Sequence, residues 1–452
     1  MSGRVMIAAI KSGSGKTICT MGLIAALKNR GIDVASVKSG PDYIDPMFHR
    51  VVLGTESANL DTFFTDRDKI CELYDDSHEI TVIEGVMGLY DGLGGIKEEG
   101  SAYDLARGLK CPIILVVDGK GMGKTIVPVI SGMLAFDTDR LIKGVIINRV
   151  SEGFYATLKK IIEDSLGINV LGYIKDDKAY NIESRHLGLV TPDVVADIRE
   201  KIDNLSNLIE KSVDIYSIID LAKHAKKLEN RNAKGKHVIT KEPKVRLAIA
   251  RDEAFCFYYS ENITALKEHG IELVEFSPMR DKKLPEDIQG ILLGGGYPEL
   301  FARELSSNTT MISEIKKAAD DGLVIVAECG GYMYLCDSVT LPDGEKWPMA
   351  GVIHTGSSYK GKLVRFGYVS MSDQTGNWIN ADEEIKGHEF HYYDCDDNGS
   401  GMRITKASTG NAYEGYHITE RMLAGYPHLY YPSCISIVDN LYEKLLAVKG
   451  SN

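Results

Sequence analysis

The sequence predicts two consecutive α/β domains on one chain of 452 residues. In the first half, short apolar runs alternate with helical patterns. These runs are nearly continuous in apolar residues, as in strands of a parallel sheet covered on both faces. A polar, basic segment interrupts the pattern between about residues 221 and 244, and a second strand–helix alternation begins at Val245. We therefore expect a doubly wound first domain followed by a different α/β domain.

Individual elements follow from the same patterns. A helix is predicted over residues 17–30, directly after the first strand. The charged segment with Gly235 and Pro243 reads as a solvated linker. We therefore place the domains at 1–222 and 244–452, with a linker at 223–243. The predicted strands are 5–10, 33–37, 80–83, 113–117 and 144–147 in the first domain, and 246–250, 272–276, 290–293 and 324–327 in the second.

Composition excludes several classes of protein. The net charge of −12 argues against a broad nucleic-acid surface, which would be basic. No run reaches the roughly 20 apolar residues that span a bilayer, and residues 1–10 lack a signal-peptide core. We expect a cytoplasmic protein with neither a membrane nor a nucleic-acid partner. Its eight cysteines show no zinc-site spacing, so most are expected to be reduced core residues.

A phosphate-binding loop joins the first predicted strand to the first helix, at residues 11–17 (KSGSGKT). Gly13 and Gly15 let the backbone fold around phosphate oxygens, so that N–H groups and the helix dipole point at the anion. Lys16 is placed to reach the β- and γ-phosphates of ATP, and Thr17 to ligate Mg²⁺.

This loop departs from the strict P-loop pattern, because Ile10 stands where the first glycine is expected. The variant with an extra lysine, here Lys11, is typical of a subclass in which that lysine reaches a neighbouring subunit's nucleotide. An exposed loop lysine is an equally good interpretation of Lys11. A homodimer is therefore only one of two possibilities.

Carboxylates follow two of the predicted strands and favour a metal site beside the phosphate loop. Glu84 comes directly after a buried strand, and Asp42 follows the second strand of the domain. Parallel strands end at the same edge of a sheet, where the loop also lies. Lys38 is expected to neutralise the transferred phosphoryl group. A second glycine-rich string, GKGMGKT at 119–125, is interpreted as a turn into a helix that lines the substrate cleft.

Cys329 differs from the other cysteines because it lies in a nucleophile elbow. An apolar strand at 324–327 runs into Glu328, Cys329 and two glycines before a helix. The helix N-terminus is expected to lower the pKa of the thiol. The N–H of Gly330 is expected to bind the oxyanion, with a second donor from the glycine loop that contains Gly295 and Gly296.

A cysteine nucleophile needs a histidine, and two stretches supply candidates. The first is His428, in the string GYPHLY. The second is GHEFH at 387–391, in which only two residues separate the histidines, so the HExxH metal motif is not met. We favour a structural or domain-interface role for His388 and His391.

Taken together, these strings resemble the cobyrinic acid a,c-diamide synthases of the cobyrinate/cobyric-acid amidotransferase family. The resemblance covers nearly the whole length and selects His428 as the catalytic histidine. It is carried by the phosphate loop and by KSGPDYIDPMFH (38–49), NLDTFF (59–64), VIEGVMGLYDG (82–92), GVIINRV (144–150), RHLGL (185–189), ARDEAFCFYY (250–259), LLGGGYPE (292–299), AECGGYMYL (327–335) and GHEFHYY (387–393).

The family implies a dethiobiotin-synthetase-like P-loop domain with a parallel sheet, followed by a class I glutamine amidotransferase-like α/β domain. It also implies an activity. ATP phosphorylates the a- and c-carboxylates of the corrinoid cobyrinic acid, and ammonia from glutamine displaces the phosphate.

Carried over by residue, the resemblance assigns roles in the first domain. It assigns Thr17, Asp42 and Glu84 to Mg²⁺. It assigns Asn148 to adenine recognition. It assigns Tyr43, Asp45 and Asp91 to the substrate cleft.

One position departs from the wider class I pattern. There a glutamate two residues after the histidine orients it, whereas this chain has Tyr430. Some other group must then hold the imidazole of His428, or the glutaminase is slow.

Two other functions remain open from the sequence. The first is the same a,c-diamidation on another tetrapyrrole, either hydrogenobyrinic acid or nickel-sirohydrochlorin. The second is a non-catalytic P-loop ATPase switch of the partitioning type with an inactive amidotransferase domain. Lys11 is the only support for this switch, and the intact elbow at Cys329 opposes it.

Overall fold

The computed structural model describes residues 2–177, 192–228, 242 and 244–451. The chain divides into two compact units, Met1–Lys236 and His237–Asn452. Most of the predicted linker at 223–243 and the RHLGL string at 185–189 lie outside the described residues. Across the described residues, no helix combines the length and the apolar character needed to cross a membrane.

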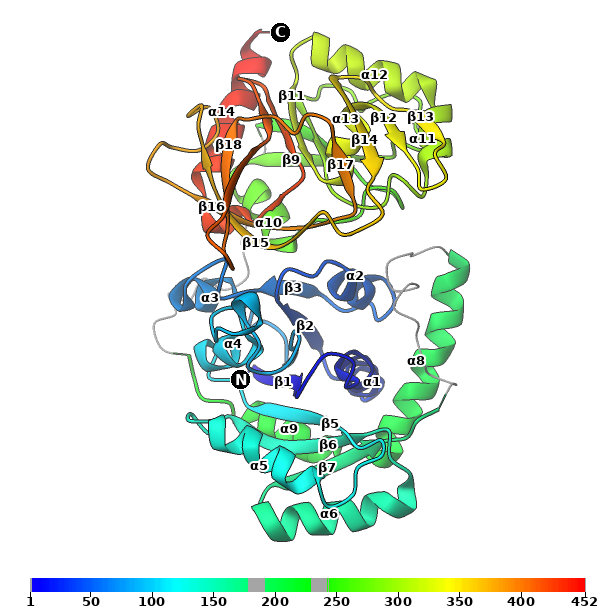
Figure 1. The fold of residues 1–452 in the computed structure, drawn as a ribbon, viewed down its shortest axis with the longest axis vertical. Helices are drawn as coiled ribbons and strands as arrows, with labels where there is room; N and C mark the ends of the chain where they lie inside the picture. The colour runs from blue at the N-terminus through cyan, green and yellow to red at the C-terminus, as the bar shows by residue number, and fades with distance from the viewer. Residues whose placement is uncertain (1, 178–191, 229–241, 243, 452) are drawn as a thin grey trace. The chain divides into compact units, whose positions relative to one another are not determined.

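The first unit is built on a seven-stranded parallel sheet in the order β3-β2-β4-β1-β5-β6-β7 (Figure 1). Its central strand, β1, is completely buried, as its continuous apolar sequence predicts. The strands are β1 (Gly3–Ala9), β2 (Val34–Ser39), β3 (Ser57–Leu60), β4 (Ile80–Glu84), β5 (Ile113–Asp118), β6 (Ile142–Asn148) and β7 (Asn169–Ile174).

Helices cover both faces of this sheet, and alternate residues of β1 enter separate cores. Val5, Ile7 and Ala9 pack with α1 (Lys16–Asn29), α8 (Pro192–Ser212) and α9 (Ile215–Lys223). Met6 and Ala8 pack on the other side with α3 (Arg67–Leu73), α4 (Ala102–Gly108), α5 (Ile126–Phe136) and α6 (Glu152–Leu166). The short helix α2 (Ile44–Val51) follows β2. Loops that follow the strands therefore meet at one edge of the sheet, which is where ligands bind in such folds.

The second unit has a six-stranded sheet in the order β20-β21-β11-β10-β8-β9, parallel except for β20. Its core strands β10 and β11 are fully buried. The strands are β8 (Val245–Ala250), β9 (Ile271–Phe276), β10 (Gly290–Leu293), β11 (Val324–Glu328), β20 (His417–Ile418) and β21 (Met422–Gly425). The helices are α10 (Ser260–Glu268), α11 (Ala302–Ser307), α12 (Thr309–Asp320), α13 (Gly330–Leu335) and α14 (Ser436–Ser451).

Two further sheets complete the second unit, and the sequence patterns did not predict them. Several of their strands are short, and the longer ones, β14, β15 and β16, are rich in polar residues and glycine, so the apolar alternation in the sequence is weak. The four-stranded sheet has the order β13-β12-β14-β17, and the five-stranded sheet β19-β18-β15-β16-β22. They comprise β12 (Cys336–Thr340), β13 (Lys346–Pro348), β14 (Ile353–Tyr359), β15 (Arg365–Asp373), β16 (Ile385–His391), β17 (Tyr393–Cys395), β18 (Met402–Lys406), β19 (Ala412–Gly415) and β22 (His428–Leu429).

The predicted fold class is confirmed. The nine predicted strands and helix 17–30 are all present, with ends that differ by at most two residues. The strands β3 and β7 were not predicted. The string at 119–125 forms turns that lead into α5, as the sequence suggested.

Candidate active sites

The phosphate loop connects β1 to α1 through two glycines in the left-handed region. Gly13 has φ 74° and Gly15 has φ 98°, a conformation that favours glycine. A Cβ atom on Gly15 would lie 2.0 Å from Nδ2 of Asn148. Asn148 Nδ2 also donates a hydrogen bond of 2.8 Å to the Ser14 carbonyl. The loop is therefore held from β6 by a side chain that leaves no room for any residue other than glycine at position 15.

Arg149 extends this support. Its guanidinium pairs with Asp118 at the end of β5 and donates a 2.9 Å hydrogen bond to the Gly13 carbonyl. This pair was not predicted, although Asp118 and Arg149 both follow predicted strands. The part of Asn148 in adenine recognition stays a prediction, whereas its contact with the loop is direct.

Lys16 lies folded back over the loop. Its ammonium donates to the carbonyl of Met87 and lies 3.5 Å from the carbonyl of Lys11. Burial and the nearby Lys38 lower the pKa of Lys16 to about 8. An anion next to the Lys16 ammonium would stabilise its charged form, so the site is electrostatically suited to a phosphate group.

Glu84 is the centre of a buried polar cluster at the end of β4. Its Oε1 accepts a 2.6 Å hydrogen bond from the Thr17 hydroxyl and lies 3.0 Å from Nζ of Lys38. Burial, and then repulsion from Asp45, raises the pKa of Glu84. The second oxygen, Oε2, accepts no hydrogen bond from the described residues. A buried carboxylate oxygen without a donor, beside a threonine hydroxyl, is a good ligand set for a hard cation.

Lys38 is enclosed by carboxylates that the sequence placed in the same region. It pairs with Asp45, and its ammonium lies 4.0 Å from Asp42 Oδ2. Burial disfavours its charged form, but Asp45 and Glu84 outweigh that effect and raise the pKa of Lys38. The same ammonium lowers the pKa of Asp45, overcoming the opposing effect of burial. The structure thus brings together three of the predicted carboxylates around one lysine.

Two residues near this cluster were not predicted. His49 is fully buried in α2, with Nε2 3.6 Å from Oε2 of Glu84. Burial lowers the pKa of His49 to about 4, so the imidazole is neutral. Asn59 donates hydrogen bonds of 2.9 Å and 2.8 Å to the carbonyls of Gly40 and Asp42 and holds the loop after β2. Both lie in the quoted KSGPDYIDPMFH and NLDTFF strings, which were the available signal.

The remaining predicted residues of the first unit lie nearby but make fewer contacts. Tyr43 is buried at the start of α2, and Asp91 accepts a 3.0 Å hydrogen bond from the backbone N–H of Gly88. Asp91 is close enough to favour the charged form of Lys16. Lys11 is exposed, and its reach to a second subunit stays a prediction.

Cys329 occupies a sharp turn between β11 and α13. Its backbone has φ 47° and ψ −104°, an uncommon conformation for a residue other than glycine. The backbone is fixed there because its N–H donates a 2.9 Å hydrogen bond to the Gly425 carbonyl on the neighbouring strand β21. Strain of this kind is found at functional sites, where surrounding contacts hold it.

The thiol of Cys329 differs from expectation in its ionisation. We expected the helix N-terminus to lower its pKa. Instead burial, reinforced by the charge of Glu299, raises the pKa of Cys329 to about 12, and a hydrogen bond to the Gly330 backbone offsets this only in part. The helix that follows has only six residues, so its dipole is small. The resting nucleophile is therefore a neutral thiol.

The glycine loop after β10 lies against the elbow. A Cβ atom on Gly330 would lie 3.1 Å from the backbone nitrogen of Gly296, which places two predicted oxyanion donors near each other. Gly295 has a different contact. Its carbonyl accepts from the backbone N–H groups of Cys256 and Phe257, and a Cβ at this position would lie 2.3 Å from Cε1 of His428. Gly295 therefore makes room for the imidazole.

His428 comes to the elbow because its strand follows β21, which pairs with β11. The imidazole is 3% exposed, and burial lowers its pKa to about 3. Its Nδ1 lies 3.8 Å from Oε2 of Glu328, the residue before the cysteine. Tyr430 stands where class I enzymes have glutamate. It is buried and packs edge-on against Tyr259, with ring centroids 5.3 Å apart.

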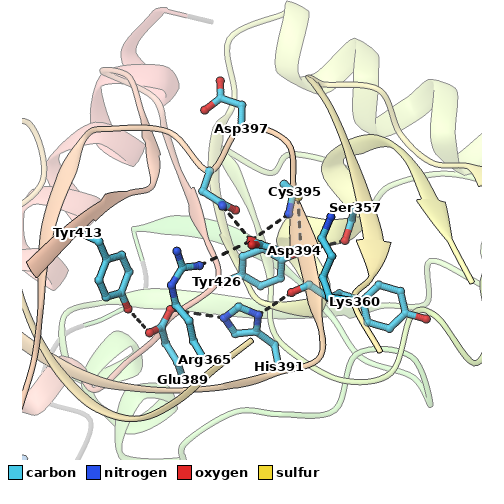
Figure 2. Close-up of polar contacts among 12 residues, drawn as sticks. Ser357, Lys360, Arg365, Glu389, His391, Asp394, Cys395, Asp397, Tyr413 and Tyr426 are labelled. Atoms are coloured by element: carbon cyan, nitrogen blue, oxygen red, sulfur yellow. Dashed lines mark hydrogen bonds and ion pairs between the residues drawn. The ribbon is translucent and has the colours of Figure 1, made fainter. Parts of the chain in front are cut away.

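The rival histidines, His388 and His391, lie on β16, and Figure 2 shows the contacts of His391. His391 has Nδ1 2.7 Å from the Tyr393 carbonyl and stacks on Tyr426 with ring centroids 4.1 Å apart. Its Nε2 is 3.5 Å from Glu389, which also accepts a hydrogen bond from Tyr413. These contacts fit the structural role expected for His391. His388 lies opposite His428 in the strand pair.

Comparisons with known proteins match both units. The family described as the CobQ/CobB/MinD/ParA nucleotide binding domain matches residues 5–190. The CobB/CobQ-like glutamine amidotransferase domain matches residues 246–433. The phosphate loop falls in the first match, and the elbow and His428 fall in the second.

Curated relatives match almost the entire chain. The chain is 39% identical to the cobyrinate a,c-diamide synthase of Thermoplasma volcanium, over 98% of this chain and 97% of that protein. It is 36% identical to the enzyme of the same name from Priestia megaterium, over 99% and 98%. For the Picrophilus torridus enzyme of that name the identity is 38%, over 95% and 96%. The predicted resemblance is thus confirmed, and the chain belongs to the cobyrinate a,c-diamide synthase family.

Proposed function

We propose that this protein catalyses the ATP- and glutamine-dependent amidation of the a- and c-carboxylates of cobyrinic acid, a step of cobalamin biosynthesis. The observation that carries this proposal is the match to enzymes of that name over nearly the full chain. The two kinds of site described above supply the two chemistries that the reaction needs. Because ATP and glutamine are cytoplasmic metabolites, we place the reaction in the cytoplasm.

The first unit activates the carboxylate. A carboxylate is a poor acyl donor, so its oxygen first attacks the γ-phosphorus of ATP, giving an acyl phosphate and ADP. Gly13, Gly15 and Lys16 bind the phosphates, and Lys38 is placed to offset charge on the transferred group. Thr17, Asp42 and Glu84 would hold Mg²⁺, which supplies charge neutralisation of the phosphates. The donor-free oxygen of Glu84 supports that assignment.

Tyr43, Asp45 and Asp91 are proposed to face the carboxylate substrate. Lys38 is already paired with Asp45. It can therefore bind a substrate carboxylate only by interacting with both carboxylates at once. Ammonia then attacks the acyl carbon, phosphate leaves, and the nitrogen loses a proton. The product is a primary amide.

The second unit releases the ammonia. Cys329 Sγ attacks the side-chain amide carbon of glutamine while His428 accepts the thiol proton. The oxyanion binds to the N–H groups of Gly330 and Gly296. His428 then protonates the departing ammonia, and water hydrolyses the thioester to glutamate.

The choice of macrocycle and the oligomeric state are separate hypotheses. Hydrogenobyrinic acid and nickel-sirohydrochlorin present similar carboxylates, so each macrocycle is assayed with ATP, Mg²⁺ and glutamine. A homodimer in which Lys11 reaches the second nucleotide predicts twice the chain mass in light scattering.

Mass spectrometry of the product tests the proposal. With cobyrinic acid we expect two successive mass changes of one amide each. Cys329→Ala should lose glutamine use but retain amidation with ammonia, and Lys16→Ala should lose both. Unchanged cobyrinic acid with the wild-type protein would refute the proposed substrate, and glutamine use by Cys329→Ala would refute the assigned nucleophile.

A further inference from the structure

The second unit lacks the glutamate that orients the histidine in class I amidotransferases, but another carboxylate lies near His428. Tyr430 occupies the expected position, but it is buried against Tyr259 and carries no charge. Burial makes imidazolium formation at His428 unfavourable, as its lowered pKa shows. Proton transfer from Cys329 to His428 therefore requires an anion nearby, or it is too costly to support turnover.

Glu328 is placed to supply that anion. It is the last residue of β11 and 6% exposed, so the strand that positions Cys329 also positions this side chain. Its Oε2 lies 3.8 Å from Nδ1 of His428. Catalytic hydrogen bonds that are long in a free enzyme often shorten in the substrate complex. Its Oε1 accepts no hydrogen bond from the described residues.

The other nearby carboxylates have partners of their own, although the charge of Glu389 also favours the imidazolium of His428. Glu389 accepts a hydrogen bond from Tyr413 and faces His391, as Figure 2 shows. Glu299 acts on Cys329, where its charge opposes thiolate formation. The charged or titratable groups that influence His428 are thus Glu328, Glu389, His388 and His391.

We propose that Glu328 is the positioning residue of the glutaminase and replaces the glutamate that is absent at position 430. Its carboxylate accepts the Nδ1–H of His428, which leaves Nε2 as the base for the Cys329 thiol. It then stabilises the imidazolium that forms when the proton arrives. The triad is therefore assembled from consecutive residues 328 and 329 and a histidine about one hundred residues later. This inference rests on the proposed glutaminase activity.

The test is glutamine hydrolysis by the full-length protein with Glu328→Gln. We expect kcat to fall by about 10²-fold or more, because the variant keeps the shape but loses the charge, while KM for glutamine changes by less than about 3-fold. Amidation with ammonia should be retained, which shows that the protein is folded. Glu389→Gln is the comparison variant, because the charge of Glu389 also favours the imidazolium of His428, and it should lower kcat less than Glu328→Gln does.

The pH profile separates positioning from packing. Burial raises the pKa of Glu328 to about 8, opposed in part by hydrogen bonds from the Leu429 backbone and the Tyr431 side chain. Glutaminase activity should therefore rise as pH increases through this region. Glu328→Asp, which keeps the charge, should retain that rise, and Glu328→Gln should lose it. Tyr431→Phe removes one of the hydrogen bonds and should move the rise to higher pH.

The outcomes distinguish the two hypotheses. If the wild-type protein does not hydrolyse glutamine, the proposed function fails. If it does, and Glu328→Gln stays within a few-fold of wild type or falls no further than Glu389→Gln, the role of Glu328 is refuted. If Glu328→Gln does not fold, a pH profile unchanged by Tyr431→Phe refutes it.

Discussion

Gly295→Ala tests the contact between the glycine loop and the catalytic histidine. The added Cβ would lie 2.3 Å from Cε1 of His428, with Nδ1 and Nε2 at 3.2 and 3.3 Å. Ordinary van der Waals contact begins at 3.4 Å, so the imidazole must move by about 1 Å (3.4 minus 2.3). A misplacement of about 1 Å in a catalytic group costs about 10²-fold in rate. Overpacking a buried site costs a further ~1–3 kcal/mol of stability.

The effect is measured by comparing glutamine hydrolysis with ammonia-dependent amidation in the same preparation. We expect the first to fall by about 10²-fold and the second to be unchanged. Gly450→Ala is the control, because it adds the same methyl group where no atom lies within 4 Å. Wild-type glutamine hydrolysis by Gly295→Ala would refute the placement of His428 against this loop.

Three further predictions concern charge. Lys38→Met leaves the buried carboxylates of Asp45 and Glu84, and the partly exposed Asp42, without their shared cation, so urea unfolding should show a loss of about 3–5 kcal/mol and both amidation activities should be lost; wild-type stability would contradict the cluster. Because the pKa of Lys16 is lowered to about 8, ATP binding above that pH should take up a proton, detected by calorimetry in buffers of different ionisation enthalpy, and Lys16→Arg should abolish the uptake. Alkylation of Cys329 by iodoacetamide should rise about tenfold per pH unit between pH 7 and 9, since its pKa is raised to about 12, and a plateau in that range would contradict a neutral resting thiol.

Much of the architecture could be predicted from the sequence, because the strands of parallel sheets are continuous apolar runs and the loops after them carry recognisable motifs. The apolar run before the phosphate loop and the one before Cys329 each predicted a buried strand, and β1 and β11 are fully buried. The convergence of Asp42 and Glu84 followed from the rule that parallel strands end together, whereas Asp45 was assigned from the family resemblance. Short antiparallel strands such as β13 and β19 carry no such signal, so the two smaller sheets were missed.

The environment of each catalytic group was less predictable than its identity. Cys329 was recognised from its elbow, but the direction of its pKa depends on how deeply the surrounding sheets bury it. Glu328 was visible in the sequence and received no role, because its approach to His428 joins positions one hundred residues apart. His49 was overlooked for the same reason, since its contact with Glu84 exists only after α2 has packed.

The backbone conformation of Cys329 is unfavourable for folding, although the nucleophile is needed for activity. At φ 47° the chain would accept glycine more readily than cysteine, by about 1–2 kcal/mol. Replacement of Cys329 by glycine therefore relieves strain, whereas alanine keeps the Cβ atom and the strain. In a cell supplied with abundant ammonia, selection would no longer maintain the nucleophile, and the elbow is where inactivating substitutions would accumulate first. Descendants of this chain that depend on free ammonia are accordingly expected to keep an intact second unit with glycine at position 329.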